Sequence, residues 1–316
     1  MSNMLEEPQI VAEAREAQKG WNIFLELVAF IGVFLVSAIA LSIAAAPASM
    51  VMMYLNADYQ AAIASGDQNK IIEIATQISG SDAMQIISLF ADIVMILVVI
   101  LFCKLLQKRR VRTIGFTKKG MVKEYFVGLL AGFIAFSATV LICVLTGALK
   151  FEGLSATFAP GMFILYVLGF MIQGMAEEVL CRGYFMVSIA RRYPLVVAAV
   201  VNAVFFAALH LTNPGITPLA FINLSLFGIF ASVYFIKRGN IWGIGAFHSI
   251  WNLVQGNFYG IKVSGLATSC TVFETTFTSG KEFLNGGSFG MEGGIATTIV
   301  LVIGIVVLCL MKKKEA

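Results

Sequence analysis

The chain has 316 residues, of which 59% are hydrophobic and 13% are charged, and its formal net charge at pH 7 is +4. A soluble domain usually carries about 25% charged residues, so this composition excludes an ordinary soluble protein and indicates a membrane protein. The basic residues stand between long apolar segments, which indicates membrane topology and not a nucleic-acid-binding surface.

Apolar segments recur along the chain at lengths that suit the hydrocarbon core of a bilayer, which takes about 20 residues per helix. They are expected as helices over residues 22–46, 86–106, 125–147, 161–190, 194–212, 217–236, 241–256 and 292–311. The sequence therefore predicts an all-α polytopic membrane protein with about eight transmembrane helices. The first of them is too long for a signal-peptide core, so we expect it to be an uncleaved span.

Lysine and arginine residues predict the orientation of these helices. If the N-terminus is cytoplasmic, the basic residues of the cytoplasmic segments run from Arg15 to the C-terminal group Lys312, Lys313 and Lys314. The opposite side then holds only four of them: Lys70, Lys150, Lys262 and Lys281. Because this asymmetry follows the positive-inside rule, we expect both termini to be cytoplasmic and the protein to be integral to a membrane.

Segments of different character divide the chain into expected parts. These are a cytoplasmic N-terminal segment (1–20), two transmembrane helices with an outer loop (21–119), a core that carries the polar membrane residues (120–256), an outer Gly-rich loop (257–291), and a last transmembrane helix with a basic tail (292–316). The first outer loop contains a helical-looking stretch around Ile71 to Ile78. The sequence shows no internal repeat of the transporter kind.

The fourth expected span contains Glu177, Glu178 and Arg182, although a charged side chain at mid-bilayer costs at least about 2.5–3.5 kcal/mol. Glu178 and Arg182 stand four residues apart with the acid first, which is the favoured order for a salt bridge on a helix. Glu177 points about 100° around the helix from its neighbour, so it is expected to stay outside that pair. Such an uncommitted carboxylate suits a general base that activates water.

The only two histidines of the chain, His210 and His248, both fall inside expected spans. Phe206 precedes the first by four residues and Asn252 follows the second by four, so each pair shares one face of a helix. Counted from the nearest basic residue, these polar groups, the glutamates and Arg182 lie in one layer about 14 Å thick. Asp92, about 24 Å deep in the second span by the same count, is expected either to face this site or to lie at the outer interface.

These residue types are those of a water-activating hydrolase, plausibly one that cuts a peptide bond. One histidine is able to share or relay the proton of the attacking water, and a second with an asparagine amide supplies the N–H donors of an oxyanion hole. A glutamate with two histidines also has the composition of a zinc site with one open position, although the sequence has no His-Glu-x-x-His motif. The residues alone leave both mechanisms open.

The motifs Glu-Glu-x-x-x-Arg, Phe-x-x-x-His and His-x-x-x-Asn, in this order on membrane helices, resemble those of the CAAX-protease and bacteriocin-processing family, also called the Abi family. This family includes the Ras-converting type of CAAX prenyl protease, and the likeness covers about residues 120–256. It implies an intramembrane glutamic endopeptidase that uses no cofactor, with zinc as the alternative. It also assigns roles: water activation to Glu177 and His210, and oxyanion stabilisation to His248 and Asn252. The salt bridge of Glu178 and Arg182 is expected to support the site structurally.

The expected partners are the lipid bilayer and a membrane-associated peptide or protein substrate, with no nucleic acid. The alternative interpretation of the same residues is a non-catalytic or proton-relaying membrane protein, such as a bacteriocin immunity protein or a transport-like protein. The missing internal repeat weighs against transport.

Overall fold

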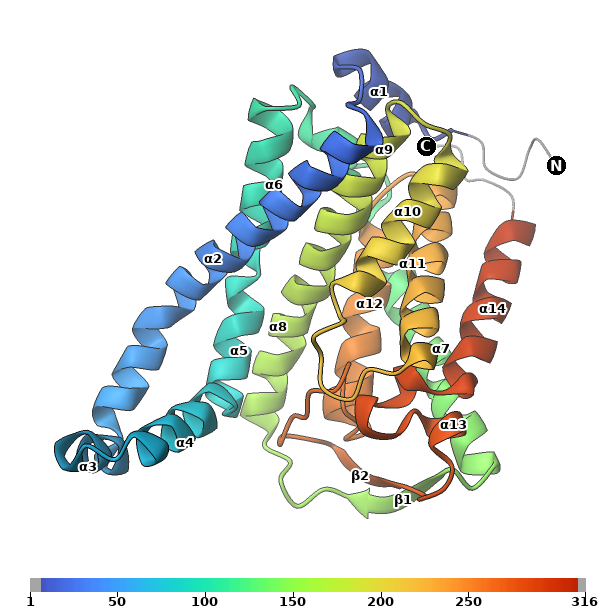
Figure 1. Ribbon diagram of the computed structural model, residues 1–316. Helices are drawn as coiled ribbons and strands as arrows, with labels where there is room; N and C mark the ends of the chain where they lie inside the picture. Colours follow the sequence, from blue (N-terminus) through green and yellow to red (C-terminus); the bar gives the residue numbers. More distant parts are fainter. Residues whose placement is uncertain (1–6, 312–316) are drawn as a thin grey trace.

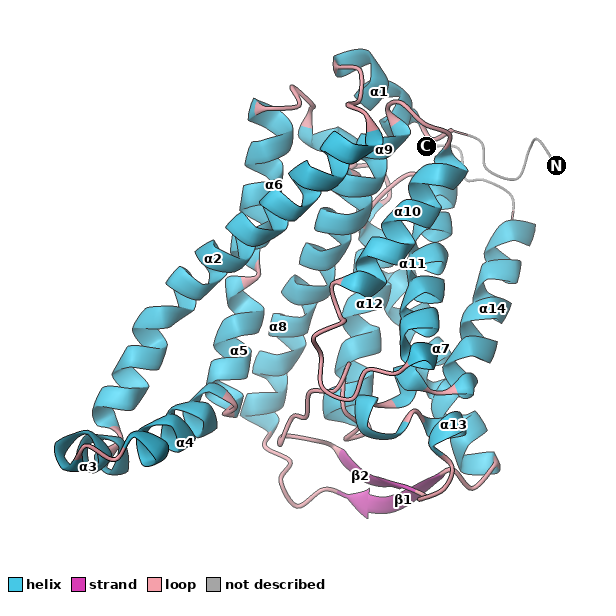
Figure 2. Cartoon of the chain, in the orientation of Figure 1, coloured by secondary structure: helices cyan, strands magenta, loops and turns pink. Residues whose placement is uncertain are grey.

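A computed structural model describes residues 7–311. Two expected segments therefore lie partly outside the described residues. They are the N-terminal segment, at residues 1–6, and the basic tail, at residues 312–316. The described chain folds mainly into helices (Figure 2). One end of the bundle carries α1 (Gln9–Ala17) and α9 (Val187–Ala190), and the opposite end carries α3 (Ala57–Ser65), α4 (Gln68–Ser79) and α13 (Glu282–Asn285) (Figure 1).

Several long helices confirm the prediction of a helical membrane protein. Within residues 7–311, five helices are long and apolar enough to cross a membrane. They are α2 (Ile23–Leu55), α5 (Asp82–Ala91) together with α6 (Ile93–Leu105), α7 (Met121–Leu145), α8 (Pro160–Glu178) with its continuation to Ala190, and α11 (Pro218–Arg238).

The remaining expected spans correspond to shorter helices. These are α10 (Leu195–Ala208), α12 (Trp242–Leu253) with the π-helical turn η3 (Val254–Phe258), and α14 (Ile295–Leu310). Each expected span thus coincides with a helix, whereas the count of eight crossings and the cytoplasmic position of the termini stay predictions. The helix expected over 194–212 was too long, because Pro214 and Gly215 end helical structure, and His210 lies in the turn after α10.

The segments at the α3 end of the bundle have more structure than predicted. The helical-looking stretch around Ile71 to Ile78 lies within α4. In the Gly-rich loop, β2 (Phe273–Phe277) pairs antiparallel with β1 (Leu149–Leu154), with Leu149 opposite Phe277 and Leu154 opposite Phe273. This sheet was not predicted because its two short strands lie far apart in the sequence, where no local pattern joins them.

Glycines bring α7 and α8 unusually close to α12. A Cβ on Gly128 of α7 would lie 2.0 Å from the carbonyl oxygen of Gly243, and Gly132 meets α12 one turn later. On α8, a Cβ on Gly174 would lie 2.4 Å from the backbone nitrogen of Ser249. Small residues allow membrane helices to pack at this distance, so the glycines fix the position of the helix that carries the third motif.

Replacing Gly128 by alanine is expected to push α12 away from α7 and to lower the free energy of unfolding by about 1–3 kcal/mol, the usual cost of overpacking. Unfolding of the purified protein in detergent, followed by intrinsic fluorescence, measures this change. The matched control is Gly32→Ala in α2, where an added Cβ meets nothing within 4 Å. Equal stability of the two variants would contradict the close packing.

Candidate active site

The expected salt bridge between Glu178 and Arg182 is present and completely buried. Arg182 Nη1 lies 2.9 Å from Glu178 Oε1, and both side chains have 0% exposure. The guanidinium also lies over the ring of Phe206, with Cζ 4.5 Å from the ring centroid, a cation–π contact. The phenylalanine of the second motif therefore packs on the arginine of the first.

Glu177 stays outside that ion pair, as its position on the helix predicted. Its side chain is 27% exposed and lines a cavity inside the bundle. One carboxylate oxygen accepts a hydrogen bond from Gln173 Nε2 at 2.5 Å, and the other lies 3.7 Å from His248 Nε2. The two adjacent glutamates are thus structurally distinct, because one is committed to an arginine and the other faces open space.

Gln173 links two of the predicted site residues and was missed by the sequence reasoning. Its amide nitrogen donates to Glu177, and its amide oxygen accepts from Asn252 Nδ2 at 3.0 Å. The available signal was its spacing, since a polar residue four positions before Glu177 shares the same helix face. Gln173 holds the carboxylate and the third-motif amide in one hydrogen-bonded chain.

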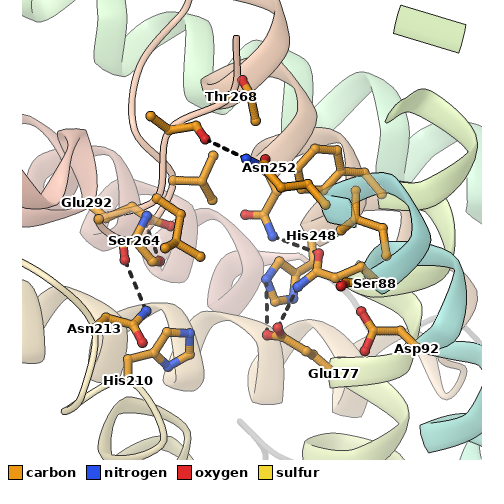
Figure 3. Close-up of a pocket in the computed structure, with 18 of the residues that line it drawn as sticks. Ser88, Asp92, Glu177, His210, Asn213, His248, Asn252, Ser264, Thr268 and Glu292 are labelled. Atoms are coloured by element: carbon orange, nitrogen blue, oxygen red, sulfur yellow. Dashed lines mark hydrogen bonds and ion pairs between the residues drawn. The ribbon is translucent and has the colours of Figure 1, made fainter. Parts of the chain in front are cut away.

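His248, and not His210, is the histidine next to Glu177 (Figure 3), and it also contacts Glu178. Its Nδ1 lies 2.8 Å from Glu178 Oε1 and its Nε2 lies 3.7 Å from Glu177 Oε2. Since a carboxylate accepts, Nδ1 carries a hydrogen, and the ring is oriented between the two acids.

His210 reaches the same cavity from the turn after α10. Its Nδ1 lies 2.9 Å from the carbonyl oxygen of Phe206. A carbonyl only accepts hydrogen bonds, so Nδ1 carries the hydrogen and Nε2 is left as an acceptor in the neutral ring. Within the described residues, no hydrogen bond or ion pair joins His210 to Glu177, although both line the cavity.

Two π-helical turns follow the site residues directly. η2 (Val179–Met186) begins immediately after Glu178, and η3 follows α12 just beyond Asn252. Such turns often occur at functional sites. η2 is braced by the buried Arg109, which donates to the carbonyl oxygen of Gly183 at 2.9 Å. In the sequence, Arg109 counted only among the basic residues that indicate membrane topology. The depth count along this helix assumed a regular α-helical rise, whereas η2 is a π-helical turn.

The cavity has a volume of about 610 Å³ and lies beside these residues. Its inner part is lined by Glu177, His210, His248 and Asn252, with aromatic rings that include Phe227. Its other walls come from the turn between α4 and α5 and from the segment 263–268. It therefore extends from the polar cluster toward the end of the bundle that carries α3 and the β-sheet (Figure 1).

The outer wall of the cavity is fixed by hydrogen bonds to Ser264, a non-glycine residue with φ of 47°. Glu292 Oε2 accepts from the Ser264 backbone nitrogen at 2.8 Å and from its hydroxyl at 2.7 Å. Asn213 donates to the Ser264 carbonyl oxygen at 3.0 Å. These contacts tie the Gly-rich loop to the 3-10 turn η5 (Met291–Gly293), which precedes α14, and to the turn that carries His210.

Asp92 was expected either to face the site or to lie at the outer interface. It lines the cavity and therefore faces the site. It stands at the break between α5 and α6. Its carboxylate is close enough to Glu177 for the two groups to interact electrostatically.

Metal ligation was the open alternative for these residues. Among residues 7–311, no three His, Cys, Asp or Glu side chains gather in an arrangement that would hold a metal ion. The ring nitrogens that carry hydrogen are engaged with the Phe206 carbonyl and with Glu178. This leaves both Nε2 atoms available, as in metal-ligating histidines, so zinc stays an open alternative although the ligand set is not assembled.

Fold and site together define a helical membrane protein with a cavity inside the bundle that is lined by carboxylates and histidines. Residues 158–254 match the family model of the type II CAAX prenyl endopeptidase Rce1-like proteins. This match runs from the start of α8 to the end of α12 and contains all three motifs, so it confirms the resemblance to the CAAX protease family. No curated protein and no solved structure matches the chain.

Replacing Arg182 by methionine is expected to lower the free energy of unfolding by about 3–5 kcal/mol, because Glu178 then stays buried without its cation. Denaturant unfolding in detergent measures the loss. The control is Arg112→Met, which removes the partner of Glu13 in an exposed ion pair of 3.6 Å and is expected to cost less than about 1 kcal/mol. Similar losses in both variants would show that the buried pair is not a structural requirement.

Proposed function

We propose that the protein is an intramembrane endopeptidase of the CAAX type, which hydrolyses a peptide bond in a membrane-associated peptide or protein with water activated by Glu177. The observation that carries the proposal is the asymmetry of the glutamate pair. Glu178 is buried against Arg182 and His248, whereas Glu177 faces the cavity with 27% of its side chain exposed. The family match over the same helices supports this chemistry. We further propose a bacterial cell membrane as its location.

Glu177 is the general base of the proposed reaction. A water in the cavity gives a proton to the carboxylate, and its oxygen bonds to the carbon of the scissile carbonyl. The C–N bond then breaks, and the departing nitrogen takes the proton. His210 is the second proton carrier, since its Nε2 has a free lone pair in the neutral tautomer. Gln173 holds Glu177 in place during these steps.

His248 and Asn252 stabilise the negative charge that develops on the carbonyl oxygen. Because Nδ1 of His248 is turned to Glu178, its Nε2 donates a hydrogen bond only when the ring is an imidazolium. Asn252 uses one amide N–H to bind Gln173 and keeps a second for the oxyanion. The same two acids that orient the ring are close enough to balance its charge.

Glu177→Ala and His210→Ala are each expected to lower the rate of peptide cleavage by about 10²-fold or more, because each removes a proton carrier. Purified protein in detergent, incubated with candidate membrane-associated peptides and followed by mass spectrometry, measures the rates. Glu152→Ala is the matched control, since Glu152 is an exposed carboxylate on β1. Unchanged cleavage in both site variants would contradict the proposed endopeptidase mechanism. A proton-relaying or immunity protein would then explain the site better.

Exhaustive chelation is expected to leave the cleavage rate unchanged, because Glu177 activates water without a metal in the proposed mechanism. The measurement compares rates before and after dialysis against a strong chelator. A loss of activity that added Zn²⁺ restores would instead establish the zinc mechanism, with Glu177 and the two histidines as its ligands.

A further inference from the structure

We propose that the cavity selects peptides that carry a lysine or arginine side chain near the scissile bond, and that Asp92 recognises this charge. The proposal rests on the proposed endopeptidase function, since it names the substrate class of the same site. It concerns a residue outside the three motifs and outside the segment that matches the family model.

The lining of the cavity is acidic. Asp92, Glu177 and Glu292 all line it, and among the described residues that do so there is no lysine or arginine. Like charges that share a partly desolvated space repel one another, and the repulsion increases as water is excluded. A cationic side chain that enters the cavity therefore relieves this repulsion.

Two of these carboxylates are already satisfied by the protein. Glu292 accepts two hydrogen bonds from Ser264, and Glu177 accepts one from Gln173 and lies beside His248. Asp92 differs, because its carboxylate has no hydrogen bond or ion pair with any of the residues 7–311. It points into the same space, close to Glu177 (Figure 3).

An occupant that displaces water from Asp92 has to replace the lost hydration, and an ammonium or guanidinium group does so with a charge-assisted hydrogen bond. The volume of about 610 Å³ accommodates a few side chains. Phe170, Leu224 and Phe227 offer apolar surface to the neighbouring positions of the peptide.

The test uses C-terminally amidated peptides of one apolar sequence, in which Lys, Gln or Glu occupies a single scanned position. With wild-type protein in detergent, the best Lys peptide is expected to exceed its Gln counterpart in kcat/KM by about tenfold, the effect of one hydrogen bond to a charged group. The Glu peptide is expected to be the poorest. In Asp92→Asn, the Lys-to-Gln ratio is expected to fall below about threefold, and in Asp92→Glu it is expected to return.

The matched control is Asp58→Asn, which removes an exposed carboxylate on α3 and is expected to keep the wild-type ratio. Binding of fluorescently labelled peptides to His210→Ala provides a readout that needs no cleavage.

Cleavage of Lys and Gln peptides at equal rates would overturn the proposed selectivity and leave the protease function intact. An Asp92-dependent preference in binding, without cleavage of any peptide by the wild type, would support the selectivity and overturn the protease function. No Lys preference in either readout would overturn the proposal.

Discussion

The buried ion pair between Glu178 and Arg182 is the constraint around which the site is arranged. Two charges with 0% exposure inside a membrane helix bundle require partners for their polar atoms. One oxygen of Glu178 binds both Arg182 and His248, and the guanidinium lies on the ring of Phe206. Side chains from all three motifs therefore meet at this pair.

This arrangement separates the tasks of two adjacent glutamates. Because Glu178 carries the structural charge, Glu177 is left to face the cavity, held by Gln173 and approached by His248. Close packing through Gly128 and Gly174 places α12 where its third-motif residues reach α8. Catalytic side chains act best when neighbours hold them before the substrate arrives. The hydrogen-bonded chain from Asn252 through Gln173 to Glu177 supplies such support.

The cavity combines two parts of the chain with different roles. The motif residues lie within 158–254, the segment that matches the family model, whereas Asp92, Ser264 and Glu292 lie outside it. The motif residues thus lie on the α8–α12 core, whereas part of the cavity lining comes from the α5–α6 break and the Gly-rich loop. In the endopeptidase that we propose, the segments around the core help to determine which peptides bind.

Sequence patterns alone determined the helical membrane class, the positions of the long helices, the Glu178–Arg182 salt bridge and the separate orientation of Glu177. These features follow from apolar length and from i,i+4 spacing, which act within one helix. Only the tertiary structure decided that His248 lies beside both glutamates, that His210 stands in a turn, that Gln173 bridges Glu177 and Asn252, and that Asp92 enters the cavity. The rotation of each helix and the π-helical turns after Glu178 and after α12 control these contacts, and both arise from packing between helices, which local spacing does not encode.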